Sequence, residues 1–124
     1  MNKEFRIASI LGALAIILGA LGAHALRDIL TPRELESFKT GVMYHMFHAL
    51  FMLIITFSKY ANNLKPSYYL ALTGIILFSG SIYLLCLDQY LGINLSFLGP
   101  VTPIGGIAFI AAWLALLQLK PSTN

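Results

Sequence analysis

Two imidazoles and a phenol lie close together in an otherwise apolar stretch of this chain, at Tyr44, His45 and His48. Imidazole gains or loses a proton near neutral pH and is a common metal ligand, so this stretch is the first candidate for chemistry. Other apolar stretches carry hydroxyl groups and one more histidine. The candidates for a shared polar site are His24, Tyr44, His48, Ser79, Ser81, Tyr83 and Thr102.

Four apolar runs carry these side chains, at about residues 7–26, 40–58, 68–87 and 101–119. A helix needs about 20 apolar residues to cross the roughly 30 Å hydrocarbon layer of a bilayer. The chain is 58% hydrophobic and 10% charged, with a mean hydropathy of +0.80, whereas a soluble domain has about 25% charged residues. We therefore predict an all-α fold: an integral membrane four-helix bundle with short links, in which residues 1–124 form a single domain.

The second helix is expected to begin at the segment Thr31-Pro32-Arg33-Glu34. This segment combines a capping residue, a proline suited to the first turn and a glutamate that completes a capping box. A helix from there to Ser58 is longer than a bilayer requires, so its first two turns are expected to lie in the headgroup layer. Thr102, which also precedes a proline, is predicted to cap the fourth helix in the same way.

Small residues recur at helical spacing in the first and fourth runs, and such faces allow helices to approach closely in lipid. The glycines expected at helix contacts are Gly12, Gly19, Gly22, Gly80, Gly105 and Gly106. The same faces could join two copies, so a homo-oligomer stays an open expectation. Trp113 lies well inside the fourth run, and we expect it to be packed rather than interfacial.

The basic residues predict an orientation. Five of them flank the side that carries both termini and three flank the other side: Lys3, Arg6, Lys59, Lys65 and Lys120 against Arg27, Arg33 and Lys39. Because positive charge is enriched on the cytoplasmic side, we expect cytoplasmic termini and a multi-pass protein of the inner or plasma membrane, with the lipid bilayer as its surroundings. The net charge of +3 without a basic patch argues against nucleic acid as a partner.

The candidate polar groups are expected to share one depth, in the leaflet opposite the termini. Tyr44 and His48 share a helix face, whereas His45 points about 100° away, at the edge of that face or toward the headgroups. An unpaired polar group in hydrocarbon costs several kcal/mol, so His48 needs a partner, and His24, Tyr44 and Tyr83 are in reach. The two serines can bond to carbonyls of their own helix.

The histidines support neither a metal site nor a haem site. His45 and His48 could present two ligands on one face, with His24 as a third, but no Asp, Glu or Cys lies beside them. A haem needs ligands from two well-separated helices, which only His24 and His48 provide. A Ser-His-acid set lacks its acid, since Asp88 falls at the membrane interface. We therefore expect no cofactor, no metal and no enzymatic activity.

Four segments carry a family resemblance, in this order: GALGAHAL at 19–26, Tyr44 with HAL at 48–50, FSGSIY at 78–83 and VTPIGG at 101–106 with Trp113. Through them the chain resembles the YgdD/YwdK-like family of small membrane proteins, which is catalogued as a domain of unknown function. The resemblance covers nearly the whole chain and implies four membrane helices. It also implies that the candidate polar residues and most of the glycines occupy signature positions. Family members often carry Gln at the position of His45, which weakens a metal pair. The resemblance implies no activity.

The sequence favours a non-enzymatic structural or interaction role, in which a layer of His, Tyr and Ser side chains holds helix register or an oligomer contact. Two alternatives stay open. One is a small oligomeric transporter or channel that uses His24 and His48. The other is a lipid, quinone or haem binder open to the outer leaflet.

Overall fold

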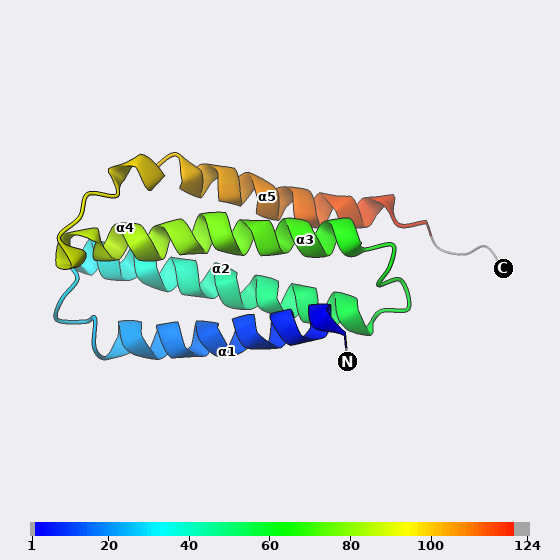
Figure 1. Cartoon of the computed structure of the whole chain (residues 1–124), viewed down its shortest axis with the longest axis horizontal. Coiled ribbons are helices and arrows are strands. Elements are labelled where there is room, and N and C mark those ends of the chain that lie inside the picture. Colours follow the sequence, from blue (N-terminus) through cyan, green and yellow to red (C-terminus); the bar gives the residue numbers. More distant parts are fainter. Residues whose placement is uncertain (1, 121–124) are drawn as a thin grey trace.

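A computed structural model describes residues 2–120 as four long helical rods joined by short links (Figure 1). The first two rods are α1 (Lys3–Ala23) and α2 (Pro32–Phe57). The third joins α3 (Lys65–Gly74), η1 (Ile75–Ser79) and α4 (Gly80–Leu91), and the fourth joins η2 (Ser96–Leu98), α5 (Val101–Ala115) and η3 (Leu116–Gln118). Each rod is long and apolar enough to cross a membrane, so the predicted all-α membrane fold is confirmed.

The start of α2 confirms the predicted capping box. The Thr31 hydroxyl accepts the backbone N–H of Glu34 at 3.1 Å, and the Glu34 carboxylate accepts the backbone N–H of Thr31 at 3.0 Å. This reciprocal pair satisfies two amide donors that a helix start leaves free. The helix then continues to Phe57 without a break, with Ser58 as its C-cap.

The start of α5 differs from the prediction. The helix begins at Val101, with Pro100 at the N-cap position and no side-chain cap. Thr102 is therefore already inside the helix, and its hydroxyl pairs with Ser81 at 2.6 Å. The prediction that Thr102 caps this helix is wrong because a neighbouring rod offers its hydroxyl a partner that the local sequence does not reveal.

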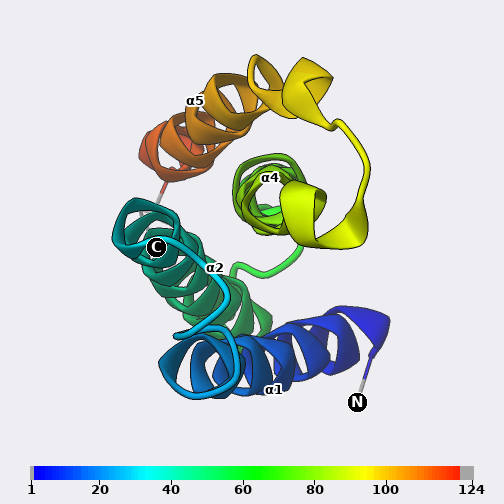
Figure 2. The same cartoon turned by 90° about the vertical axis from the view of Figure 1, so that its left-hand side faces the viewer.

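The four rods are stacked in sequence order rather than closed into a ring. α1 packs against α2, α5 packs against α3 and η1, and α2 contacts α3, η1 and α4. The end-on view accordingly has α1 and α5 on the outside (Figure 2). In the most apolar 18-residue stretch of each rod, 39% of the residues are buried in α2 and 33% in the third rod, but only 17% in α1 and 17% in the fourth rod. The two inner rods are therefore where polar side chains can be shielded from lipid.

Glycine determines how closely the outer rods approach the inner ones, but only at some predicted positions. A Cβ on Gly105 would lie 2.7 Å from the Phe78 Cα, and one on Gly22 would lie 3.0 Å from the Phe38 ring. A Cβ on Gly19, Gly80 or Gly106 would meet its nearest neighbour at an ordinary contact distance of 3.4–3.9 Å, and a Cβ on Gly12 would meet nothing within 4 Å. Gly74 and Gly41, which the sequence analysis did not single out for packing, face Phe109 and the Tyr83–Ile82 pair closely.

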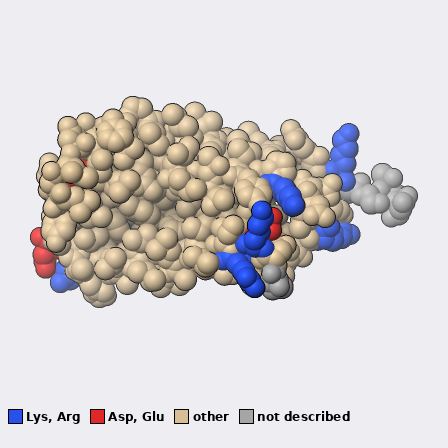
Figure 3. Space-filling model, in the orientation of Figure 1, with Lys and Arg blue, Asp and Glu red and all other residues tan. Residues whose placement is uncertain are grey.

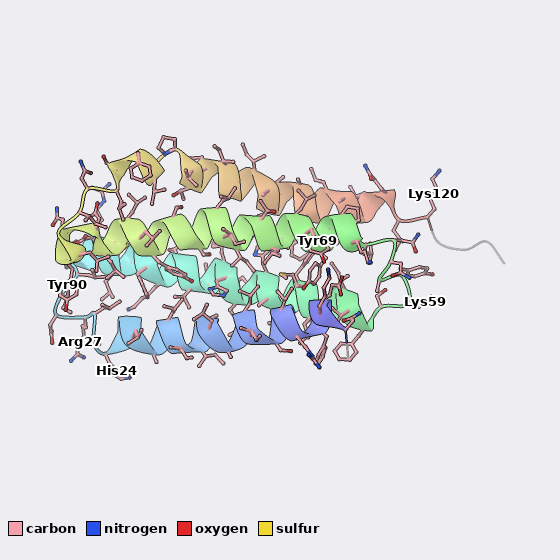
Figure 4. All side chains as sticks on the ribbon, viewed as in Figure 1. His24, Arg27, Lys59, Tyr69, Tyr90 and Lys120 are labelled. Carbon is pink, nitrogen blue, oxygen red and sulfur yellow. The ribbon has the colours of Figure 1, made fainter. Side chains whose placement is uncertain are left out.

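Charge is distributed unequally between the two ends of the stack. The start of α1 and the end of α5 lie at the same end (Figure 1), and basic side chains gather there on the visible face (Figure 3). Lys59 and Lys120 lie at that end, whereas Arg27 lies at the opposite end (Figure 4). Between the two ends the visible face is almost free of charged side chains (Figure 3), as expected for a surface in contact with acyl chains.

Candidate polar site

His48 is held by hydrogen bonds to both ring nitrogens. Its Nδ1 lies 2.7 Å from the carbonyl oxygen of Tyr44, which can only accept, so Nδ1 carries the proton and donates. Its Nε2 is then an acceptor, and the indole N–H of Trp113 donates to it at 3.1 Å. The imidazole also stacks on the Phe109 ring with centroids 3.7 Å apart. His48 is therefore a neutral, fully paired link between α2 and α5.

Trp113 differs from its prediction. Its side chain is 52% exposed, so the expectation that it is packed inside is wrong for much of the ring. The N–H edge nevertheless faces inward to His48, and the ring packs on Phe51 with centroids 4.6 Å apart. This placement follows from the outer position of α5, where an apolar ring can face lipid while its polar edge is satisfied by the neighbouring helix.

His45 is buried between helices, whereas the sequence analysis expected it at the edge of a face or toward the headgroups. Its side chain is only 1% exposed, and its Nδ1 lies 2.8 Å from the Tyr83 hydroxyl. Its Nε2 is buried and has no hydrogen-bond partner among the described residues. A signal was available, because His45 follows Phe38 by seven residues and Gly41 by four, and both of these are buried on the same face of α2.

Two serine hydroxyls of the third rod, one in the π turn η1 and one in the first turn of α4, bond to neighbouring rods. The Ser79 hydroxyl donates to the Gly41 carbonyl of α2 at 2.7 Å, so the expectation that it bonds within its own helix is wrong. Ser81 does donate to its own helix, at the Phe78 carbonyl 3.0 Å away. Its oxygen therefore accepts the Thr102 hydroxyl proton from α5. Turns of this π type often occur at functional sites, and here the turn lies beside the α2 backbone.

His24 does not join these groups. The helix α1 ends at Ala23, and His24 is its C-cap residue, exposed in the turn that follows. It lies beside Arg27 at the end opposite the termini, outside the stack (Figure 4). The expectation that His24 reaches His48 is wrong because the predicted first helix extended too far. A path or a haem that needs both His24 and His48 has no support from this geometry.

Tyr44 lines a lipid-facing hollow instead of pairing. Its ring lies 5.0 Å from that of Phe78 and 6.0 Å from that of Phe109. Its hydroxyl has no hydrogen bond in the part of the chain that the structure describes, and the side chain is 38% exposed. Tyr44 and His48 thus share a face as predicted, but only the backbone of Tyr44 serves His48.

The candidate residues therefore form separate links between rods rather than one cavity, and the bond from Ser79 of η1 to Gly41 of α2 is one of them. His48 and Trp113 join α2 to α5, His45 and Tyr83 join α2 to α4, and the Ser81–Thr102 pair joins α4 to α5. Within residues 2–120 no three His, Cys, Asp or Glu side chains are grouped so as to hold a metal ion. The arrangement is suited to fixing helix positions, since polar side chains from different rods satisfy one another inside the membrane.

The chain is similar to proteins that are named as membrane proteins without an activity. Residues 18–106 match the family described as "Protein of unknown function (DUF423)". The chain is 39% identical over 120 residues to the UPF0382 membrane protein YwdK of Bacillus subtilis, which covers 93% of this chain and 94% of that protein. It is 35% identical over 114 residues to a UPF0382 membrane protein of Schizosaccharomyces pombe, with 91% and 97% covered. No solved structure matches the chain.

These matches confirm the resemblance to the YwdK-like family and agree with the four candidate spans. None of the names reported above states an enzymatic activity. The chain, with its four stacked apolar rods, belongs to the DUF423 family of membrane proteins of unknown function.

Proposed function

We propose that this protein is a non-enzymatic, multi-pass protein of the cell membrane with a structural or interaction role, and that its polar layer holds the helices in register. The observation that carries this proposal is the pairing of His48, whose two ring nitrogens are both occupied by groups of the chain itself. A catalytic or transporting imidazole needs a free nitrogen or a path to water. A histidine that is already paired on both sides supports a locking role.

The orientation and the domain organisation form part of the proposal. The chain acts as one membrane domain, with both termini in the cytoplasm. The excess of Lys and Arg at the end where α1 starts and α5 ends supports this orientation, because cytoplasmic ends carry more positive charge (Figure 3). A cysteine-accessibility experiment with one cysteine placed in the link after α2 and another in the link after α1 tests it. The cysteine after α1 is expected to react with an impermeant reagent added outside the cell.

The outer face of α1 is where a second copy would pack in a homo-oligomer. Only 17% of the residues in the apolar stretch of α1 are buried within the chain, and a Cβ on Gly12 would meet nothing within 4 Å. Mass measurement of the purified protein in detergent, with Gly12→Leu as the variant, tests this part separately. Loss of a wild-type dimer in the variant supports the contact, whereas a monomeric wild type removes it.

A double-mutant cycle tests the locking role. Trp113→Phe removes the indole donor and keeps an aromatic ring, and His48→Ala removes the acceptor together with the stack on Phe109. We expect both variants to unfold more readily in detergent, with a coupling of about 0.5–1.5 kcal/mol between them. Tyr44→Phe is the control, since the hydroxyl that it removes makes no hydrogen bond in the described chain, and its stability should equal that of the wild type.

The competing function is tested in proteoliposomes. If the protein moves protons or solutes through His48, a flux should appear in wild-type vesicles and disappear in His48→Ala vesicles. The locking role predicts the same flux in both, at the level of protein-free vesicles. A flux that depends on His48, or a small molecule that restores the stability of His48→Ala, would refute the proposal.

A further inference from the structure

An open groove lies between α2 and α5 and has the third rod as its floor, on the side where α2 and α5 flank α4 (Figure 2). Its outer half has a volume of about 410 Å³ and is lined by Arg33, Glu34, Ser37, Ile82, Leu85 and Thr102, among others. Its inner half has a volume of about 390 Å³ and is lined mainly by Tyr44, Phe78, Pro103, Gly106, Ile110 and Trp113. The halves follow one another along the same helix faces: Ser37 of the outer half is seven residues before Tyr44 of the inner half on α2, and Ile82 is four residues after Phe78 on the third rod. Each volume is typical of a ligand site.

The groove changes from charged to apolar along its length. Arg33 and Glu34 lie in the first turn of α2, at the end of the stack opposite the chain termini. Beyond Thr102 the lining is almost entirely aliphatic and aromatic. From Thr102 to Trp113 the helix rises about 17 Å at about 1.5 Å per residue, which is close to half of the roughly 30 Å hydrocarbon layer. The inner half therefore matches an acyl chain that extends from the headgroup level toward the bilayer centre.

The charges at the mouth select the headgroup. Arg33 offers a guanidinium, which binds phosphate through paired N–H donors. Glu34 offers a carboxylate, of which one oxygen accepts the Thr31 amide and the other is available to an ammonium group. A headgroup with net negative charge would bring an uncompensated charge beside Glu34, and a choline group has no N–H to donate.

From this geometry we infer that the groove binds a zwitterionic phospholipid with a primary ammonium group, a phosphatidylethanolamine. Its phosphate contacts Arg33, its ammonium contacts Glu34 and one acyl chain lies in the inner half of the groove as far as Trp113. The inference goes beyond the locking role of the polar layer. It needs neither a free His48 nor an oligomer.

Three substitutions address separate parts of the bound lipid. Arg33→Gln removes the phosphate contact. Glu34→Gln removes the carboxylate charge and keeps an oxygen for the capping box, which accepts Glu or Gln at this position. Gly106→Leu fills the inner half, and its Cβ has room because the nearest atom, on the Phe78 ring, would be 3.8 Å away. The matched controls are Arg27→Gln and Ala25→Leu, both at exposed positions of the link after α1 that do not line the groove.

The assay is native mass spectrometry of the delipidated protein with phosphatidylethanolamine, phosphatidylcholine or phosphatidylglycerol of identical acyl chains. We expect wild type and both controls to retain phosphatidylethanolamine about tenfold better than the other two lipids, which is the effect of one charge-assisted hydrogen bond. Arg33→Gln should weaken all three lipids, Glu34→Gln should abolish the preference for ethanolamine over choline, and Gly106→Leu should remove retention altogether. Thermal unfolding of each variant without lipid confirms that it is folded.

Three results would overturn the inference. Equal retention of all three lipids would make the groove part of the ordinary lipid-facing surface. A preference for phosphatidylglycerol would mean that Arg33 acts alone at the mouth. Crosslinking of a cysteine at position 106 to a second copy in liposomes would identify the occupant as protein.

Discussion

Two neighbouring glycines of α5 provide a sharp test of how closely this helix approaches the third rod. A Cβ on Gly105 would lie 2.7 Å from both the Leu77 carbonyl carbon and the Phe78 Cα, whereas a Cβ on Gly106 would lie 3.8 Å from the Phe78 ring. Both positions are inside the same helix. Changing either glycine to Ala therefore brings the same gain in helix propensity, about 1 kcal/mol. The difference in unfolding free energy between the two variants then reports only how the added methyl group packs.

Gly106→Ala should leave the protein as stable as the wild type or stabilise it by up to about 1 kcal/mol. Gly105→Ala forces a methyl group against backbone atoms, which cannot rotate away as a side chain can, and overpacking of this kind costs about 1–3 kcal/mol or more. The free energy of unfolding of Gly105→Ala should therefore fall below that of Gly106→Ala by about 1–3 kcal/mol.

The measurement is unfolding in mixed micelles with increasing denaturing detergent, followed by tryptophan fluorescence. Trp113 is the only tryptophan of the chain, and it lies on α5 in contact with His48 and Phe51, so its emission reports the separation of α5 from α2. Equal stability of the two variants, or a more stable Gly105→Ala, would show that α5 does not approach η1 as closely as described. That result would also remove the geometry on which the groove depends.

Three further predictions follow from single contacts. Tyr83→Phe leaves His45 without its hydrogen bond in a buried position and should lower the free energy of unfolding by about 1 kcal/mol. An unchanged free energy in the same fluorescence titration would mean that the hydrogen bond between His45 and Tyr83 does not form. Thr31→Ala removes the hydroxyl that caps the Glu34 amide and should lower the free energy of unfolding by about 1 kcal/mol. Amide hydrogen exchange in the first turn of α2 should be faster than in the wild type, and slower exchange would contradict the prediction. His24→Ala should leave the thermal midpoint unchanged, because the side chain is exposed in a turn, and a clear loss of stability would restore His24 to the polar layer.

The sequence was sufficient for the features that depend on local signals. Hydropathy over about 20 residues identified all four spans, because crossing hydrocarbon is a property of each segment taken alone. The capping box at Thr31 was predictable for the same reason, since its partners are three residues apart. The placement of Tyr44 and His48 on one face of α2 also followed from helical periodicity.

The pairing of the polar groups depended on which rod lies next to which, and the sequence did not contain that information in a local form. His45 was expected at an edge and is buried, His24 was expected inside and is exposed, and Trp113 was expected to be packed and serves His48 from a lipid-facing ring. For His45 and Trp113 the outcome was determined by which rods lie next to α2 and α5, and for His24 by the end of α1 at Ala23. Spacing within a single helix shows which side chains share a face, as for His45 with Phe38 and Gly41, but it does not show which rod that face meets.

The length and apolar composition of four segments by themselves determined that this chain is a four-span membrane protein. Only the tertiary structure decided that His48 is paired on both sides, that Gly41 and Gly74 are close-contact positions, and that a groove with Arg33 and Glu34 at its mouth lies between α2 and α5. The physical reason is that spanning a bilayer is set by each segment's transfer into hydrocarbon, whereas hydrogen bonds and grooves exist only between segments.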